Sequence, residues 1–124
     1  MKLPILILVS ADSIEANALG QEVMKSNPSI EQAMYEGVKY VMVFSSVDEA
    51  NRYIDSRKLH HKRRAIPIAT PHEFVSVFGQ LADEGFGGVI TDFASKGIPA
   101  FDPLDLYLGA MRAALHHDAG RQHA

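Results

Sequence analysis

The chain has 124 residues, with 12 basic and 15 acidic side chains and a formal net charge of −3. This length suits one domain with its own hydrophobic core, and the acidic balance gives no general attraction for nucleic acid or an acidic membrane. Cysteine is absent from the sequence, which excludes disulfides, thiolate catalysis and cysteine-ligated metals. We expect residues 1–118 to form a single domain and residues 119–124 to form a flexible tail.

The N-terminal segment MKLPILILVSA has one lysine, a short apolar run and small residues, as a secretion signal does. Its apolar run, residues 3–9, barely reaches the length of a signal core and contains Pro4. A short run of leucine and β-branched residues is more typical of a buried strand, which we place at residues 4–9. No segment approaches the roughly 18 apolar residues of a membrane span. We therefore expect a soluble, cytoplasmic protein.

The segment after this strand is expected to be helical. Asp12 and Glu15 have the spacing of a capping box, which predicts a helix over residues 14–25. An Asn-Pro step should end this helix, and residues 29–36 are expected to form a second short helix that stops at Gly37. The pattern leaves open whether the two helices dock on a sheet or form a mobile cover.

The remainder of the chain alternates apolar runs with helices whose starts are clearly marked. Ser46 and Thr70 are each followed three residues later by a glutamate, so each hydroxyl is placed to cap a helix. Asp102, followed by Pro103, repeats the pattern. The predicted helices cover residues 47–58, 71–84 and 103–117, and the predicted strands cover residues 40–44, 66–69, 88–91 and 98–101.

These strands also predict the kind of sheet. Residues 40–44 and 66–69 lie in almost continuously apolar runs, which is typical of strands covered on both faces. Pro67 lacks an N–H group, so its strand should lie at an edge or begin there. Because only six residues separate 88–91 from 98–101, these strands should pair as an antiparallel hairpin. We predict a three-layer-like α/β domain (α+β being the alternative), with a mixed sheet of about five strands and about four helices.

The segment GFGGVITDFASKG raises two chemical hypotheses. Its glycines follow a helix and precede a strand, the reverse of the order in a phosphate-binding loop, so we interpret Gly85 as a helix C-cap. Asp92 stands where a strand ends, and with Ser95 and Lys96 it is the candidate catalytic group. However, an aspartate at a strand end usually caps a turn, and no second carboxylate or histidine has a meaningful spacing to it. We favour the capping interpretation and a protein that is not an enzyme.

The basic run RKLHHKRR, residues 57–64, is the dense positive patch of the sequence. It could contact the phosphates of a nucleic acid or another polyanion. It also fits a solvated connection in which cations stabilise a helix C-terminus and guard an edge strand. Because no aromatic residues are interleaved with it, we favour the structural interpretation. The candidate binding residues are Arg57, Lys58, Lys62, Arg63 and Arg64.

The histidines do not show a metal-ligand pattern. The adjacent pairs His60-His61 and His116-His117 would diverge on a helix or a strand. No predicted helix contains two histidines four residues apart. We therefore expect no metal and no cofactor.

From residue 39 onward, the order of elements resembles the N-terminal domain of the SseB family, which are small bacterial α/β proteins. The resembling stretches are YVMVFSSVDEANRYI, AIPIATPHEFVSVF and GGVITDFASKGIPAFDPLDLYL, about two thirds of the chain. In that family a later strand enters a turn that is commonly rich in Asn-Pro, whereas here the turn is TDFASKG. The family has no established catalytic residues, so the resemblance implies a non-enzymatic binding or regulatory module.

Three functions follow, in order of preference. The first is a small non-enzymatic protein-interaction or regulatory domain that binds a protein partner or itself through a sheet edge or a helix face. The second is binding of nucleic acid or another polyanion through residues 57–64, and the third is a small enzyme that uses Asp92. Candidates for an exposed apolar partner surface are Met24, Met34, Tyr35 and Tyr107.

Overall fold

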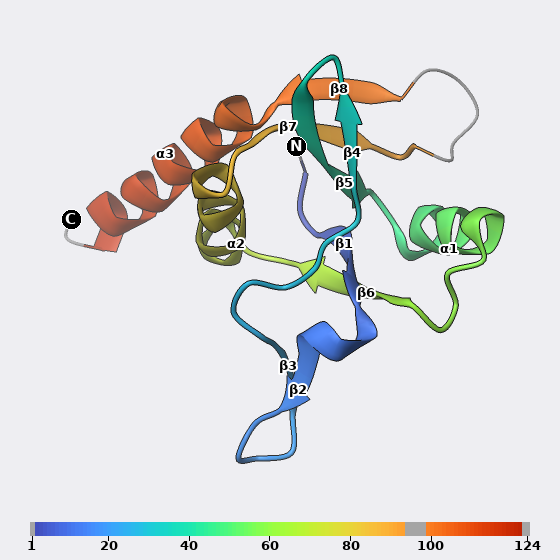
Figure 1. Cartoon of the computed structure of the whole chain (residues 1–124). Coiled ribbons are helices and arrows are strands. Elements are labelled where there is room, and N and C mark those ends of the chain that lie inside the picture. The colour runs from blue at the N-terminus through green and yellow to red at the C-terminus, as the bar shows by residue number, and fades with distance from the viewer. Residues whose placement is uncertain (1, 94–98, 123–124) are drawn as a thin grey trace.

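A six-stranded mixed sheet forms the centre of the computed structural model, which describes residues 2–93 and 99–122 (Figure 1). Its strands are β1 (Ile5–Ser10), β4 (Gln32–Tyr35), β5 (Val38–Phe44), β6 (Arg63–Ile68), β7 (Phe86–Thr91) and β8 (Ala100–Pro103). The strand order is β6-β1-β5-β7-β8, and β4 pairs with the N-terminal half of β5. β5 and β7 run parallel, whereas the other pairs of this sheet are antiparallel. The predicted mixed sheet, the β7–β8 hairpin and the edge position of Pro67 are confirmed.

Over the described residues, three α-helices cover the sheet: α1 (Val47–Arg57), α2 (Pro71–Asp83) and α3 (Leu104–Gln122). The predicted caps of the first two are confirmed, because Ser46 Oγ accepts from the N–H of Glu49 at 3.2 Å and Thr70 Oγ1 from that of Glu73 at 3.1 Å. Asp102, the third predicted cap, instead has a carboxylate that accepts a hydrogen bond from the hydroxyl of Tyr107. None of these helices combines the length and the apolar composition needed to cross a lipid bilayer.

The core lies on both faces of the sheet, because side chains alternate along its strands. In β1, Ile5 and Ile7 point into the cluster that contains the buried faces of α2 and α3, whereas Leu6 and Leu8 point into the cluster that contains the buried face of α1. Figure 1 shows the result, with α2 and α3 on one side of the sheet and α1 on the other. The predicted three-layer arrangement is confirmed.

The predicted helix over residues 14–25 is wrong. After a short 3-10 turn, η1 (Ala11–Ser13), the chain forms a two-stranded hairpin of β2 (Ile14–Ala16) and β3 (Glu22–Met24), which projects from the body of the molecule (Figure 1). Its turn is held by Asn17, whose Oδ1 accepts from the backbone N–H groups of Leu19 and Gln21 at 2.9 and 3.0 Å. Gly20 adopts φ +78° there. A side-chain-capped turn of this kind competes with helix formation.

The second predicted helix, residues 29–36, is also wrong, because residues 32–35 form β4. Glu36 and Gly37 have φ values of 51° and 80° and join β4 to β5. Two consecutive positive φ values are the requirement of a two-residue hairpin turn that matches the twist of the strands. Gly37 therefore turns a hairpin instead of ending a helix, whereas Gly85, at φ +98°, does follow a helix end as predicted.

Candidate interaction face

α1 covers only part of its face of the sheet. Its buried side chains pack on the C-terminal half of β5 and on β1. Figure 1 shows α1 beside that end of β5, away from β4 and β8. The buried sheet side chains of this cluster are Leu6, Leu8, Met42 and Phe44, and Ala33 of β4 and Ala65 of β6 pack against it partly buried. The N-terminal half of β5, with β8 and the C-terminal end of β4, is therefore left open on this face within the described part of the chain.

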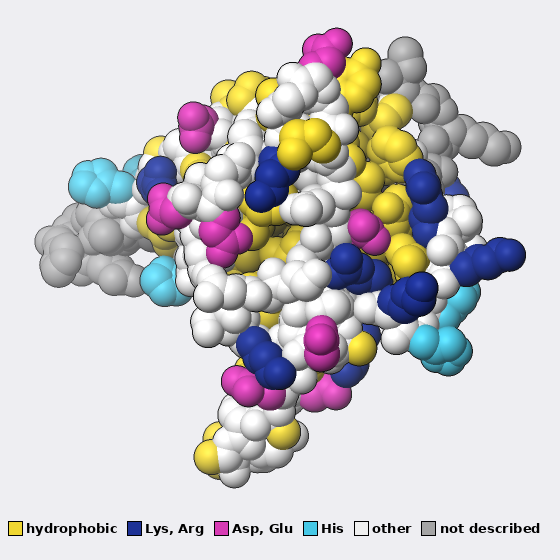
Figure 2. Space-filling view, viewed as in Figure 1, with side chains coloured by type: hydrophobic (Ala, Val, Ile, Leu, Met, Phe, Trp, Pro, Cys, Tyr) yellow, Lys and Arg dark blue, Asp and Glu magenta, His cyan; other side chains and the backbone are white. Residues whose placement is uncertain are grey.

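The open area carries exposed apolar side chains from three strands. Tyr35 of β4 exposes 56% of its surface, Val38 of β5 exposes 38%, and Phe101 of β8 exposes 42%. Figure 2 shows apolar side chains gathered over these strands, with Lys and Arg side chains along their lower border. We call Tyr35, Val38, Tyr40, Phe101 and Pro103 the aromatic face. Contiguous exposed apolar side chains, unlike single ones, mark binding surfaces.

The three rings of the aromatic face contact one another across the sheet. The ring centroids of Tyr40 and Phe101 lie 5.5 Å apart with the rings nearly perpendicular, and those of Tyr35 and Phe101 lie 5.8 Å apart. Glycine in β7 makes this contact possible, because a Cβ atom at Gly88 would overlap the ring of Tyr40. A Cβ at Gly87 would lie 3.2 Å from Val38 Cγ1. The two glycines thus let the side chains of Val38 and Tyr40 from β5 lie over β7.

A shallow groove of about 320 Å³ runs along this face. Its lining residues are Val38, Tyr40, Gly87, Phe101, Asp102 and Pro103. The charged group among them is the Asp102 carboxylate, which already accepts a hydrogen bond from Tyr107. The volume is at the low end of ligand-binding clefts, and the lining is predominantly apolar. The groove can therefore receive an apolar side chain of a partner.

The four residues predicted as a partner surface have different positions. Tyr35 lies on the aromatic face. Met34 is 65% exposed, but alternation along β4 places its side chain on the opposite face of the sheet. Met24 and Tyr107 are partly buried and pack against the core beneath α2 and α3. Sequence reasoning missed Phe101, Val38 and Tyr40, because strand periodicity cannot show which part of a face a helix covers.

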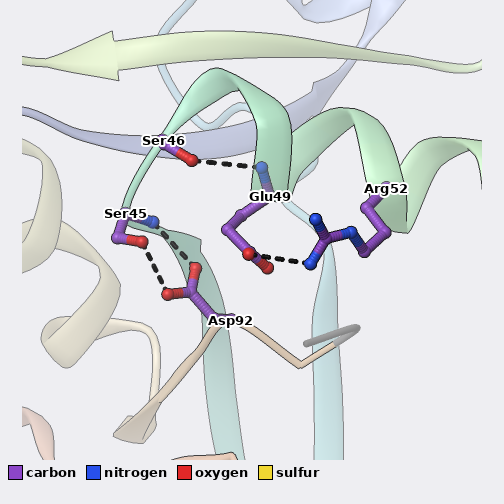
Figure 3. Close-up of polar contacts among 5 residues, drawn as sticks. All are labelled: Ser45, Ser46, Glu49, Arg52 and Asp92. Carbon is purple, nitrogen blue, oxygen red and sulfur yellow. Dashed lines mark hydrogen bonds and ion pairs between the residues drawn. The ribbon is translucent and has the colours of Figure 1, made fainter. Parts of the chain in front are cut away.

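Asp92, the candidate catalytic group, lies at the carboxyl end of β7 beside the carboxyl end of β5 (Figure 3). Its Oδ1 accepts from the backbone N–H of Ser45 at 2.8 Å, and its Oδ2 accepts from the hydroxyl of Ser45 at 2.6 Å. Its own N–H donates to the carbonyl of Val43, and its φ is +55°. Both carboxylate oxygens thus bind a distant segment, which differs from the expected cap of the aspartate's own turn. The proposed companions Ser95 and Lys96 lie outside the described residues.

Glu49 supplies a second carboxylate near Asp92 and Ser45 (Figure 3). Its Oε1 accepts from Arg52 at 3.0 Å. Its Oε2 is the buried side-chain oxygen without a hydrogen-bond partner among residues 2–93 and 99–122. In the same part of the chain, no three His, Cys, Asp or Glu side chains gather as a metal site. The spacing of a capping box accounts for the backbone of Glu49 but does not predict where its side chain lies.

The basic run is divided by the fold. Arg63 and Arg64 stand on successive positions of β6, so their side chains leave opposite faces of the sheet. Arg63 Nε lies 3.6 Å from Glu31 Oε2, and Arg64 forms a two-bond ion pair with Glu22 at 3.0 and 2.6 Å. The hydrogen bond and the charge of Arg64 lower the pKa of Glu22. Both arginines thus connect β6 to acidic groups of the preceding segment.

The other three candidate cations lie near the end of α1. The guanidinium of Arg57 lies 5.7 Å from the ring centroids of both Tyr53 and Phe93. Lys58 closes the helix at φ 55°, and the N–H of Lys62 donates to the carbonyl of Leu59 in the turn that follows. The five candidate residues therefore do not form one continuous cationic surface.

No protein-family model matches the chain, and no curated protein matches it at a significant level.

Proposed function

We propose that the protein is a small, cytoplasmic, non-enzymatic interaction or regulatory domain that binds a protein through the aromatic face. The observation that carries the proposal is the contact of three rings, from β4, β5 and β8, on an area of sheet that α1 leaves open. Two of these rings, Tyr35 and Phe101, are exposed. The resemblance to the SseB family of bacterial proteins agrees with this proposal.

The composition of the aromatic face supports a protein partner. The centre of a protein–protein interface is enriched in aromatic residues and depleted of charge, and Tyr is frequent among the residues that dominate binding energy. None of the five residues of the face is charged. The side chains stand on strands rather than on loops, so little conformational entropy is lost when a partner orders them.

The other two functions have weaker support. Both oxygens of Asp92 are engaged by Ser45, whereas a general base needs a lone pair directed at its substrate. Arg63 and Arg64 are close to carboxylates of their own chain, and a phosphate would have to displace these. Structural roles therefore account for most of the residues on which those functions depend.

Affinity capture from native lysate at low salt, with and without nuclease, tests the proposal. A variant with Tyr35→Ser and Phe101→Ser is compared with Leu106→Ser, which removes an equally exposed apolar side chain from α3, on the opposite side of the sheet. We expect capture of a protein in stoichiometric amount, with a recovery that survives nuclease and is unchanged in the control. In the double variant its recovery should fall at least tenfold, since hot-spot aromatics at interfaces contribute about 2 kcal/mol or more.

Equal recovery by all three proteins, or recovery of no protein, would contradict the proposal. Recovery that disappears with nuclease and with Lys58→Ala and Lys62→Ala would instead assign function to the basic run.

A further inference from the structure

The aromatic face adjoins an open edge of the sheet. β8 is the last strand in the order and pairs with β7 on one side, and no strand of the described residues pairs with its other side. Such an edge presents unpaired N–H and C=O groups and is a template for another strand. Phe101 stands on β8, so a strand added at this edge would lie directly beside the aromatic face.

The two ends of the sheet differ in how they are protected. The opposite edge, β6, carries Arg63, Arg64 and Pro67, which are the residues that natural proteins use to prevent pairing of edges. β8 contains no lysine or arginine, and its one charged residue, Asp102, is bonded to Tyr107. Pro103 limits the available ladder to the first three residues of β8. The β8 edge is thus short but open.

We propose that a second copy of the chain occupies this edge, with β8 pairing antiparallel to β8 of its partner about a twofold axis. This proposal rests on the proposed function, because the edge adjoins the aromatic face, and it names a second copy as the partner at that edge. A twofold axis perpendicular to a sheet pairs a strand with itself in antiparallel orientation, and it gives both copies the same contact. The two aromatic faces then form one continuous surface centred on the two Phe101 side chains.

Charge favours a second copy at this position. A self-complementary interface brings identical groups together, so any charge at its centre would face a like charge. Tyr35, Val38, Tyr40 and Phe101 are uncharged. The same operation at β6 would bring Arg63 and Arg64 of two copies together, which favours β8 over β6 as the edge that self-pairs.

Cysteine cross-linking tests the contact, because the natural chain has no cysteine. Ala100→Cys and Asp102→Cys each place one thiol on β8 without removing an aromatic ring. In the register centred on Phe101, residue 100 of one copy lies opposite residue 102 of the other. We therefore expect a mixture of the two variants to form a mixed disulfide rapidly at micromolar protein, and faster than either variant alone. The control is Leu19→Cys, at the tip of the projecting hairpin, where the side chain is 82% exposed. Cross-linking of the control as fast as of the β8 variants would overturn the proposal.

The molar mass in solution provides the second readout. We expect sedimentation or light scattering to give twice the 13.6 kDa of the chain at micromolar concentration. Phe101→Glu places two like charges at the axis and should raise the dimer dissociation constant at least tenfold, whereas Leu106→Glu should not. A dimer unaffected by Phe101→Glu would place the interface elsewhere and refute the proposal. Folding of each variant is verified by circular dichroism, and the cross-linking result stands without Phe101→Glu.

The two proposals fail in different ways. A wild-type chain that is monomeric at all concentrations, with no β8 cross-link, overturns self-pairing. If the wild-type chain captures a protein that the variant with Tyr35→Ser and Phe101→Ser does not, the aromatic face keeps its proposed function and its partner is a different protein.

Discussion

Asp92 and Ser45 are 47 positions apart in the chain, yet both carboxylate oxygens of Asp92 accept hydrogen bonds from Ser45 (Figure 3). Ser45 immediately follows β5, and the cap of α1 is the next residue. The contact therefore joins the carboxyl ends of two parallel strands and sets where the chain leaves the sheet to start a helix. It also keeps Asp92 in the left-handed region, at φ +55°.

Replacing Asp92 should therefore change stability. Asp92→Ala removes both hydrogen-bond acceptors and places alanine, which disfavours the left-handed region, at a positive φ. We therefore expect a loss of about 1–3 kcal/mol in the free energy of unfolding. Asp92→Asn keeps one acceptor and tolerates this φ, and it should lose less. Urea denaturation measures both. Asp83→Asn, at an exposed position at the end of α2, is the control and should cost nothing. A loss no larger for Asp92→Ala than for Asp83→Asn would show that the contact of Asp92 with Ser45 does not stabilise the fold.

Gly88 and Gly109 should respond in opposite directions to the same change. Gly88→Ala places a methyl group against the ring of Tyr40, which also contacts Phe101, so we expect a loss of roughly 1–3 kcal/mol by overpacking. Gly109 lies inside α3 with no atom within 4 Å of an added Cβ. Gly109→Ala should therefore stabilise the protein by roughly 0.5–1 kcal/mol. Thermal and urea unfolding compare the pair, and equal shifts would show that the Tyr40 ring is not confined.

Tyr107 should make stability depend on pH at the alkaline end. Burial, together with the hydrogen bond to Asp102 and its charge, raises the pKa of Tyr107 from 10.0 to about 12. The folded protein thus holds the phenolic proton more tightly than the unfolded chain does. The resulting stabilisation is complete below pH 10 and is lost as the pH rises from about 10 to about 12.

Tyr107→Phe should remove this part of the pH dependence, and Asp102→Asn should lower the pKa of Tyr107. The unfolding free energy at a series of pH values and the difference in phenolate absorbance between wild type and Tyr107→Phe measure the two effects. A difference spectrum that titrates with a midpoint near 10 would contradict the assignment.

Much of the fold could be predicted from short segments. The starts of α1 and α2 follow from Ser46 with Glu49 and from Thr70 with Glu73, because a cap is a contact between residues three positions apart. The β7–β8 hairpin follows from the length of its connection. Each of these features depends on neighbours in the chain, so the local pattern was sufficient.

Residues 14–36 show where local patterns fail. Their glutamates, alanine and leucine suit a helix, but the turn at Asn17 and the pairing of β4 with β5 outweigh that preference. One signal was present in the sequence. Glu36-Gly37 stands between two strand-like runs, and two residues ending in glycine are typical of a hairpin turn. Strand pairing supplies backbone hydrogen bonds and burial that helix propensity, a weak preference, does not offset.

The candidate sites show the same division. Patterns within a few positions predict the strand that holds Phe101, the strand that leads to Asp92, and the protection of the β6 edge by its arginines and Pro67. They predict a helix, however, where Tyr35 lies on β4. The contact of Asp92 with Ser45, and the meeting of Tyr35, Tyr40 and Phe101 over the glycines of β7, depend on which strands become neighbours and on how far α1 reaches. These are contacts between distant segments, whose free energy comes from packing in the assembled sheet, and packing is not encoded in any short stretch of the chain.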